Sequence, residues 1–411
     1  MNEGLSFESI LKKDNNWLLF KELYKDELSE DIIHEVEKML KCCTRECGFA
    51  TYVCPHCGTT KTIPFSCKSK LCSRCGKKYT DIWSQALSEK LLNCDHRHIV
   101  LTISNKLWPF FINNPSLQIL LLNTAAKIIK KVFSQKQRLT IGFTLVLHPF
   151  GDDLKANFHV HAIVTCGGLF KDNNQFIKVD YIDYEFIRKT WQYEILTALR
   201  KHLLKNKAVL NPIIDWCFKN RTNGFVIFAD RVIKDSKQNA LSYVARYTRH
   251  PPISKRRILS YNGYNVSFSY EAYGQEHTKT MPKFEFIKAV LQHTTSKQFK
   301  TVRRFGLYSR RSFAKYEIAK SLLPPQSTEN IKEFNWRRNL TTLTNKDPLA
   351  CEKCGQQMAL WSITYRDKSG TLKTIYKDDW FNETSPPESF EDIRQDETQR
   401  WRQISMSEVS Y

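Results

Sequence analysis

Residues 158–168 read Phe-His-Val-His-Ala-Ile-Val-Thr-Cys-Gly-Gly, an apolar run that carries two histidines. Alternate residues of a β-strand project from the same face, so a strand here places His159 and His161 side by side. Val160 then points the other way, into a core. Two neighbouring imidazoles can hold one divalent ion, although a half-buried strand that happens to carry two histidines is the simpler alternative.

The stretch before this strand is predicted to complete the site. Residues 141–148 form a second apolar strand, and the turn-rich residues 149–157 connect it to the histidine strand. In an antiparallel hairpin the end of one arm faces the start of the other, which brings His148 opposite His159. His148 is therefore the predicted third metal ligand, with Asp152 as the alternative.

A second feature with chemical potential lies at residues 241–249, Leu-Ser-Tyr-Val-Ala-Arg-Tyr-Thr-Arg. A helix here places Tyr243 and Tyr247 one turn apart on the same face. A tyrosine can form a covalent intermediate with a phosphodiester when a metal withdraws charge from that phosphodiester. The alternative is that the two tyrosines only pack on a core. The presence of the histidine pair in the same sequence favours a catalytic role for them.

Composition indicates a nucleic-acid partner. The chain has 411 residues, enough for two or three domains, and 63 Lys and Arg against 42 Asp and Glu give a formal charge of +21. That excess attracts polyphosphates such as DNA or RNA. The sequence shows neither an apolar run of about 18 residues nor the features of a secretion signal, which predicts a cytoplasmic protein without a membrane span. It also lacks the phosphate-binding loop of an ATP-driven motor.

The cysteines indicate zinc. Eight of the 13 lie within residues 42–76, and Cys54–Cys57 and Cys72–Cys75 are both Cys-x-x-Cys knuckles followed by glycine. Two such knuckles can form a tetrahedral sulfur cage, and this spacing favours zinc over disulfides. A third knuckle at 351–354 has only two cysteines within reach in the sequence, and reads as half a site or a remnant. The predicted zinc ligands are Cys54, Cys57, Cys72 and Cys75, with Cys42 and Cys67 as further candidates.

Strands and helices alternate through residues 96–310, with a hairpin signal at Asn262-Gly263. This pattern predicts an α+β fold with a mainly antiparallel sheet flanked by helices, preceded by a small helical and zinc-binding domain. The predicted parts are residues 1–93 for that first domain, 94–315 for the catalytic domain, and 316–411 for a C-terminal region with a knuckle and an acidic polar tail. The side chains predicted to contact DNA are Arg246, Lys255, Arg256, Arg257, Arg303 and Arg304. For Arg303 and Arg304 a solvated helix face is the alternative.

Taken together, these motifs resemble the rolling-circle insertion-sequence transposases of the HUH two-tyrosine class, IS91 type. The resemblance covers roughly residues 40–360. It is carried by the cysteine pattern of residues 42–75, by Leu-His-Pro-Phe-Gly at 147–151 followed by His-Val-His, by Tyr-Val-Ala-Arg-Tyr-Thr at 243–248, by residues 253–257, and by residues 347–355. Asn157 stands where many relatives have a histidine.

The resemblance implies an HUH-endonuclease-like fold in which His159 and His161, with a third ligand, hold Mg²⁺ or Mn²⁺. It implies that Tyr243 or Tyr247 attacks single-stranded DNA at the transposon ends, leaving a 5′-phosphotyrosine and a free 3′-hydroxyl. Host replication or helicase machinery would supply the single strands at the bacterial nucleoid. A plasmid rolling-circle replication initiator with the same site, and a non-enzymatic zinc-dependent nucleic-acid-binding protein, are the alternative functions.

Overall fold

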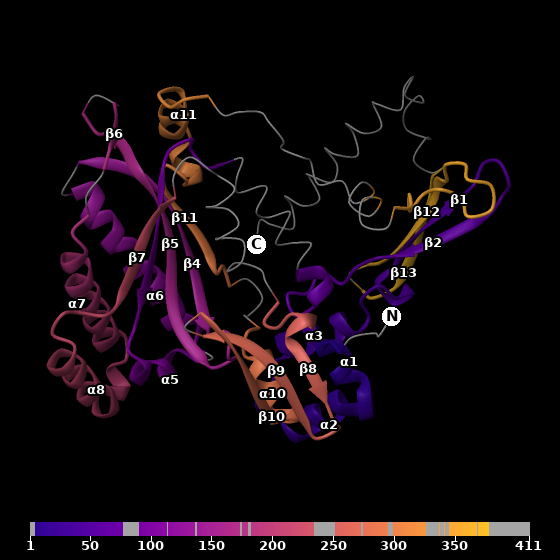
Figure 1. Cartoon of the computed structure of the whole chain (residues 1–411), viewed down its shortest axis with the longest axis horizontal. Coiled ribbons are helices and arrows are strands. Elements are labelled where there is room, and N and C mark those ends of the chain that lie inside the picture. The colour runs from indigo at the N-terminus through magenta and orange to yellow at the C-terminus, as the bar shows by residue number, and fades with distance from the viewer. Residues whose placement is uncertain are drawn as a thin grey trace. The chain divides into compact units, whose positions relative to one another are not determined.

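The computed structural model of the chain is shown in Figure 1. It describes residues 5–76, 90–112, 114–135, 138–172, 175–179, 182–233, 251–272, 274–294, 299–325, 337, 341, 345–367 and 369–377.

The chain divides into two compact units, and each is assembled from two separate stretches. The first unit comprises residues 1–36 and 68–331, and the second comprises residues 37–67 and 332–411. The sequence predicted three consecutive parts instead, at 1–93, 94–315 and 316–411. The units differ from those parts because strand pairing and helix packing join segments that lie far apart in the sequence.

The first unit is built around an antiparallel sheet with the strand order β11-β4-β5-β3-β7. Its two longest strands, β4 and β5, pair as a hairpin, as predicted. The short strand β6 (Phe176–Lys178) pairs with the far end of β5. The bounds of the sheet's strands are β3 His96–Thr102, β4 Leu139–Phe150, β5 Ala156–Phe170, β7 Ile227–Ile233 and β11 Val302–Gly306.

Helices cover one face of this sheet, as Figure 1 shows. They are α5 (Trp108–Phe111), α6 (Pro115–Lys130), α7 (Tyr184–His202) and α8 (Lys207–Asn220). Alternate strand residues such as Leu145, Val160 and Ala162 join them in one large apolar core. Trp191 of α7 is fully buried there, and its indole N–H donates to the Thr102 carbonyl at 2.6 Å. This core fixes the sheet from behind and leaves the opposite face for function.

The opposite face of the sheet is polar toward one end. Residues that lie directly across paired strands share a face, and the register aligns His161 with Val146 of β4 and with Val100 of β3. Toward the other end of the same face, helix α11 (Phe313–Ser321) contributes to a small apolar cluster with Leu92, Leu169 and Leu307. That end is therefore packed, whereas the histidine end is lined by imidazoles.

A second sheet in the same unit gathers segments from far along the chain. Strands β8 (Ile258–Tyr261), β9 (Asn265–Ala272) and β10 (Gln275–Pro282) form antiparallel hairpins, the first at the predicted Asn-Gly turn. Helix α10 (Lys283–Leu291) follows them. Helices α1 (Phe7–Lys12) and α2 (Asn16–Leu23) pack on this layer, with Phe7 against Phe286 and the Asn16 amide donating to the Tyr261 hydroxyl at 2.7 Å.

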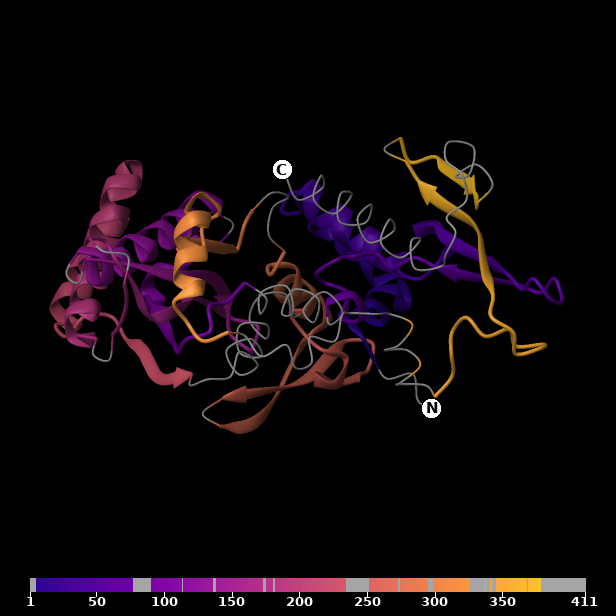
Figure 2. The ribbon, with the colours of Figure 1, turned by 90° about the horizontal axis from the view of Figure 1, so that it is seen from above.

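The second unit holds a four-stranded antiparallel sheet with the order β13-β12-β1-β2. Its strands are β1 (Phe49–Val53), β2 (Thr60–Pro64), β12 (Ala359–Arg366) and β13 (Leu372–Tyr376). In Figure 2 the yellow β12 and β13 lie beside the indigo β1 and β2, which come from the other part of the chain. The chain enters this unit through α3 (Glu30–Leu40), close to the helix predicted at residues 31–41.

The predicted α+β fold, with antiparallel sheets flanked by helices and an N-terminal cysteine-rich region, is confirmed. Two predicted elements have shifted bounds: the strand expected at 224–230 is β7, three residues later, and the glycines expected to end the histidine strand lie inside β5. The predicted tyrosine helix at 239–248, the helix at 81–93 up to residue 89, and the acidic tail at 378–411 lie outside the described residues.

Candidate metal centres and nucleic-acid face

Three histidines converge on the open end of the main sheet. His148 ends β4 directly opposite His159 of β5, and His161 follows two residues later on the same face. Their metal-binding nitrogens all lie within 4.8 Å of one another. The structure thus brings together the predicted pair and the predicted third ligand, through the hairpin geometry on which the prediction was based.

Burial keeps these imidazoles neutral. Loss of solvent, followed by the nearby His159 and His293, lowers the pKa of His148 to about 3. Burial also lowers the pKa of His159 and holds that of His161 well below the usual value of 6.5. A histidine must be neutral to donate a lone pair to a metal, so at physiological pH the group is ready to bind a cation.

The hydrogen bonds around the group aim its nitrogens inward. The His159 Nδ1–H donates to the Asn157 carbonyl at 2.6 Å, which leaves Nε2 with a lone pair. That Nε2 lies 3.3 Å from Nδ1 of His148. Two nitrogens bound to one ion at about 2.1 Å lie about 3.0–3.4 Å apart, depending on the angle between them. The spacing therefore fits ligands of a single ion. Asn157 acts through its backbone carbonyl, so this contact does not depend on the side chain at position 157.

His98 belongs to the same constellation, although the sequence ranked it below the His159–His161 pair. Its ring stacks on that of His161 with 5.1 Å between centroids, and its Nε2 lies 2.9 Å from Nδ1 of His161. When His161 Nδ1 carries the shared proton, its Nε2 keeps the lone pair that a metal ligand needs. His96, two residues earlier, instead lies 2.7 Å from the Tyr308 hydroxyl at the packed end of the sheet.

Asp152, the alternative third ligand, is outside the group of converging nitrogens. It lies in the turn between the two arms, where its backbone carbonyl accepts a hydrogen bond from Arg257. Arg257 also donates to the Ser269 carbonyl at 2.8 Å, and burial lowers the pKa of its guanidinium. This predicted DNA contact therefore has a structural part, connecting the turn of the histidine hairpin to β9.

The other predicted DNA contacts fall on different faces. Arg304 of β11 lies across from Thr144, on the histidine face. Arg303 lies on the helix face and donates to Asn123 of α6 at 2.9 Å. Lys255 and Arg256 are exposed in the short turn before β8. Arg246, Tyr243 and Tyr247 lie outside the described residues.

The sequence-based prediction missed an exposed aromatic side chain on the histidine face. Phe228 of β7 lies across from Val100, which in turn lies across from His161. Its side chain is 55% exposed, although the residues on either side of it pack on the core. The signal was present in the strand sequence, because an alternating strand with a phenylalanine on the polar face breaks the usual pattern.

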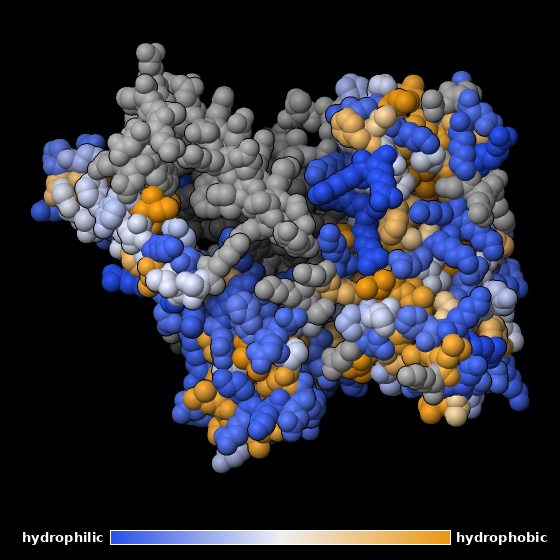
Figure 3. Space-filling model, turned by 180° about the vertical axis from the view of Figure 1, so that it is seen from behind, coloured by the Kyte–Doolittle hydropathy of each residue, from blue (hydrophilic) through white to orange (hydrophobic). Residues whose placement is uncertain are grey.

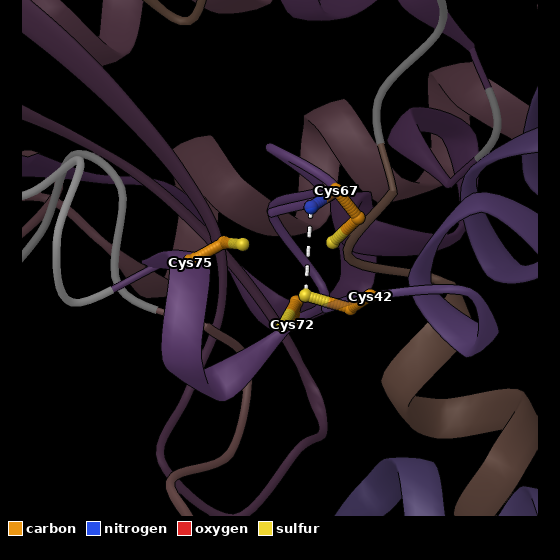
Figure 4. A group of neighbouring side chains, drawn as sticks. All are labelled: Cys42, Cys67, Cys72 and Cys75. Carbon is orange, nitrogen blue, oxygen red and sulfur yellow. Dashed lines mark hydrogen bonds between the residues drawn. The ribbon is translucent and has the colours of Figure 1, made fainter. Parts of the chain in front are cut away.

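Four cysteines form one sulfur cluster in the first part of the chain (Figure 4). The ligand atoms of Cys42, Cys67, Cys72 and Cys75 lie within 4.8 Å of one another, and all four residues are buried. The Cys67 amide donates to the Cys42 sulfur at 3.4 Å, which favours a thiolate there. This set differs from the predicted cage, which combined the 54–57 and 72–75 knuckles.

The 54–57 knuckle lies instead with the C-terminal one. Cys54, Cys57, Cys351 and Cys354 form a second group whose sulfurs are within 4.8 Å. Hydrogen bonds from the side chain and backbone of Thr59 lower the pKa of the Cys57 thiol to about 6. The knuckle at 351–354, which looked incomplete in the sequence, is therefore half of a complete set of four cysteines.

No helix among the described residues is long and apolar enough to cross a membrane. On the face shown in Figure 3, apolar residues lie scattered among polar ones.

Comparison with known proteins identifies two regions of the chain. Residues 142–315 match a family model described as a putative transposase, and residues 14–103 match a transposase zinc-binding domain of the IS91 type. The chain is 29% identical to the transposase for insertion sequence element IS801 of Pseudomonas savastanoi pv. phaseolicola, over 79% of this chain and 82% of that protein. It is 25% identical to a putative transposase, y4qJ, of Sinorhizobium fredii, over 77% and 85% of the two chains. No solved structure matches it.

Proposed function

Because this chain belongs to the IS91-type insertion-sequence transposases, we propose that it nicks and rejoins single-stranded transposon-end DNA through a 5′-phosphotyrosine. The observation that carries this proposal is the convergence of His148, His159 and His161 at the open end of a rigid sheet. Such a site is suited to hold a divalent cation beside a phosphodiester. The coarser conclusion, a DNA-processing transposase with a zinc-binding domain, follows from the family itself.

The three imidazoles are the residues that would hold Mg²⁺ or Mn²⁺. Bound there, the ion would withdraw charge from the scissile phosphate and make its phosphorus a better target. His98 keeps His161 oriented by its hydrogen bond, and Asn157 does the same for His159. The helical layer behind the sheet excludes water from the rear of the site and keeps the ligands in place before any ion arrives.

The nucleophile in this proposal is Tyr243 or Tyr247. The phenol loses its proton and attacks the phosphorus, the new P–O bond to tyrosine forms, and the bond to the 3′ oxygen breaks. That oxygen takes up a proton and leaves as a 3′-hydroxyl. The reverse attack by a 3′-hydroxyl regenerates the tyrosine, so rejoining needs no ATP. Two tyrosines allow the protein to hold one cleaved end while it cuts another.

Two side chains on the histidine face are positioned to receive the DNA strand. The Arg304 guanidinium suits a phosphate, and the exposed ring of Phe228 suits a base stacked beside the site. Lys255 and Arg256, both exposed, supply further positive charge in the turn before β8. The proposed set of DNA contacts also includes Arg246, Arg257 and Arg303. Arg257 would use the donor atoms that its structural hydrogen bonds leave over, and Arg303 would contact DNA from the helix face. Because the sequence lacks a motor motif, host replication or helicase machinery would expose the single strands.

The test is a covalent-adduct assay. Full-length protein is incubated with a labelled single-stranded oligonucleotide carrying the transposon end, with Mg²⁺, Mn²⁺ or chelator, and analysed on a denaturing gel. We expect an adduct that needs the divalent ion and disappears when Tyr243→Phe and Tyr247→Phe are combined. Tyr264→Phe, at a position 80% exposed on a different element, is the matched control and should leave the adduct unchanged. An adduct that persists in the double variant would remove both tyrosines from the mechanism.

A further inference from the structure

The knuckles at 54–57 and 351–354 are built as copies of one turn. In each, the amide of the following glycine donates to the carbonyl of the first cysteine at 2.9 Å. In each, the first cysteine's amide donates to the carbonyl five residues later at 2.8 Å, which is that of Thr59 or Gln356. Gly58 and Gly355 have φ values of 70° and 74°, in the left-handed region that glycine adopts at little cost. Such matched turns are what two halves of one metal site require.

The sulfur spacing fits a shared metal better than it fits disulfides. Cys54 and Cys354 have sulfurs 3.4 Å apart, and the Cys57 sulfur lies 3.6 Å from both Cys351 and Cys354. A disulfide would need about 2.05 Å. Four thiolates held at about 2.3 Å from a tetrahedral zinc ion are about 3.8 Å from one another. The distances lie close to that second value, and all four residues are free cysteines.

Among the residues that the structure describes, the apolar cluster around these cysteines is small. The apolar cluster there consists of Cys54, Cys351 and Met358, with partly buried neighbours. The β1–β2 hairpin carries one knuckle and β12 follows the other, and β1 pairs with β12 in the centre of the sheet. A lone hairpin is marginal in water, and a domain with so small a core usually depends on a metal or disulfide.

We propose that Cys54, Cys57, Cys351 and Cys354 bind a second zinc ion, which closes a zinc-binding domain assembled from two stretches of chain 300 residues apart. The match to the transposase zinc-binding domain ends at residue 103, so it contains only one of these two knuckles. The 42–67–72–75 cluster holds the other ion. The inference concerns metal content and folding, and it stands whether or not the proposed nicking activity does.

Zinc content measured by mass spectrometry on purified full-length protein tests the pairing of the knuckles. The intact chain should carry two ions. The double variant Cys351→Ser with Cys354→Ser should retain one zinc ion, and so should Cys54→Ser with Cys57→Ser. The variant with all four substitutions should still retain one zinc ion. Adding Cys72→Ser and Cys75→Ser to the C-terminal pair should leave none. Cys47→Ser, outside both groups, is the matched control and should retain two.

Two results would overturn the proposal. One is an unchanged zinc content when Cys351 and Cys354 are replaced. The other is the same ion being lost from the 54–57 and the 72–75 variants, because those knuckles would then share a cage. Since a missing ligand can unfold the unit, Cys354→His provides a variant that keeps four ligands. With Co²⁺ in place of zinc, its visible spectrum should shift from a four-thiolate to a three-thiolate, one-imidazole pattern, and an unaltered spectrum would contradict the assignment.

Discussion

The histidine site and the cluster of Cys54, Cys57, Cys351 and Cys354 both bring together ligands for a cation, but the fold positions the two sets of ligands in different ways. His148 and His159 are 11 residues apart in one hairpin, and a large helical core fixes that hairpin from behind. Cys54 and Cys354 are 300 residues apart, and the apolar cluster around them is small in the part of the chain that the structure describes. The difference implies that the histidine site is preorganised by the fold, whereas the fold around the cysteines is organised by its metal.

Removal of zinc should give the largest effect and tests that contrast directly. We expect a strong chelator to abolish hydrogen-exchange protection in the amides of β1, β2, β12 and β13, while the amides of β4 and β5 stay protected. The physical reason is that zinc–thiolate bonds stabilise the sheet of β1, β2, β12 and β13, whereas apolar burial stabilises the sheet that contains β4 and β5. The measurement is hydrogen exchange by mass spectrometry with and without zinc.

If protection of β12 survived chelation, the second unit would be stable on its own packing, and the contrast would be wrong. Loss of protection in β4 and β5 on chelation would also contradict the contrast, because the helical core would then not be enough to keep the histidine hairpin folded. Readdition of Zn²⁺ is the control, because only a reversible loss can be assigned to the metal.

A histidine ligand should matter for metal binding and not for the fold. We expect His159→Ala to weaken Mn²⁺ binding more than about 100-fold, beyond the usual effect of a neighbour that only orients a ligand, with the sheet still folded. Calorimetry measures the affinity and circular dichroism the fold. His277→Ala on β10, which alters an imidazole on the other sheet, should change neither. Unaltered Mn²⁺ affinity in His159→Ala would mean that the three imidazoles are structural.

The comparison also separates what the sequence could predict from what it could not. The alternation of His159, Val160 and His161 is a local pattern, and a hairpin fixes its partner within a few residues, so the site was predictable. For the cysteines, spacing identified the knuckles, but it paired the 54–57 knuckle with the 72–75 knuckle, whereas the structure places it with the 351–354 knuckle. Nothing in the spacing along the chain says which knuckles share an ion, because that depends on the pairing of β1 with β12.

Other long-range features escaped prediction for the same reason. The packing of α1 on α10, shown by Phe7 against Phe286, depends on two apolar faces that meet only in the folded chain. His98 was ranked low because it lies on another strand, and only the register of β3 against β5 brings it to His161. These missed contacts join elements that are far apart in the sequence, whereas the predicted site lies within one hairpin.

His98 offers a smaller test of preorganisation. Replacing it with alanine removes the hydrogen bond that orients His161, and we expect Mn²⁺ affinity to fall about 10- to 100-fold, as is typical for partners behind a metal ligand. His98→Gln, which can keep one hydrogen bond, should recover part of that loss, whereas a role limited to packing would give equal losses in both variants. His96→Gln, on the same strand but beside Tyr308, is the control and should leave Mn²⁺ affinity unchanged.

The smallest expected effect is the pH dependence of stability in the metal-free first unit. Burial lowers the pKa of His148 to about 3 and that of His98 to about 4, against 6.5 for an exposed histidine. The unfolded chain therefore binds protons that the folded chain refuses. The contribution of these two histidines to the free energy of unfolding is complete above pH 6.5. It is lost as the pH falls toward 4 and then 3, at no more than about 1.4 kcal/mol per pH unit for each histidine. Urea unfolding between pH 7 and 4 should show this slope, and His148→Asn should reduce it. A flat profile without metal would mean that these imidazoles are solvated, and that the fold does not hold the site ready for its cation.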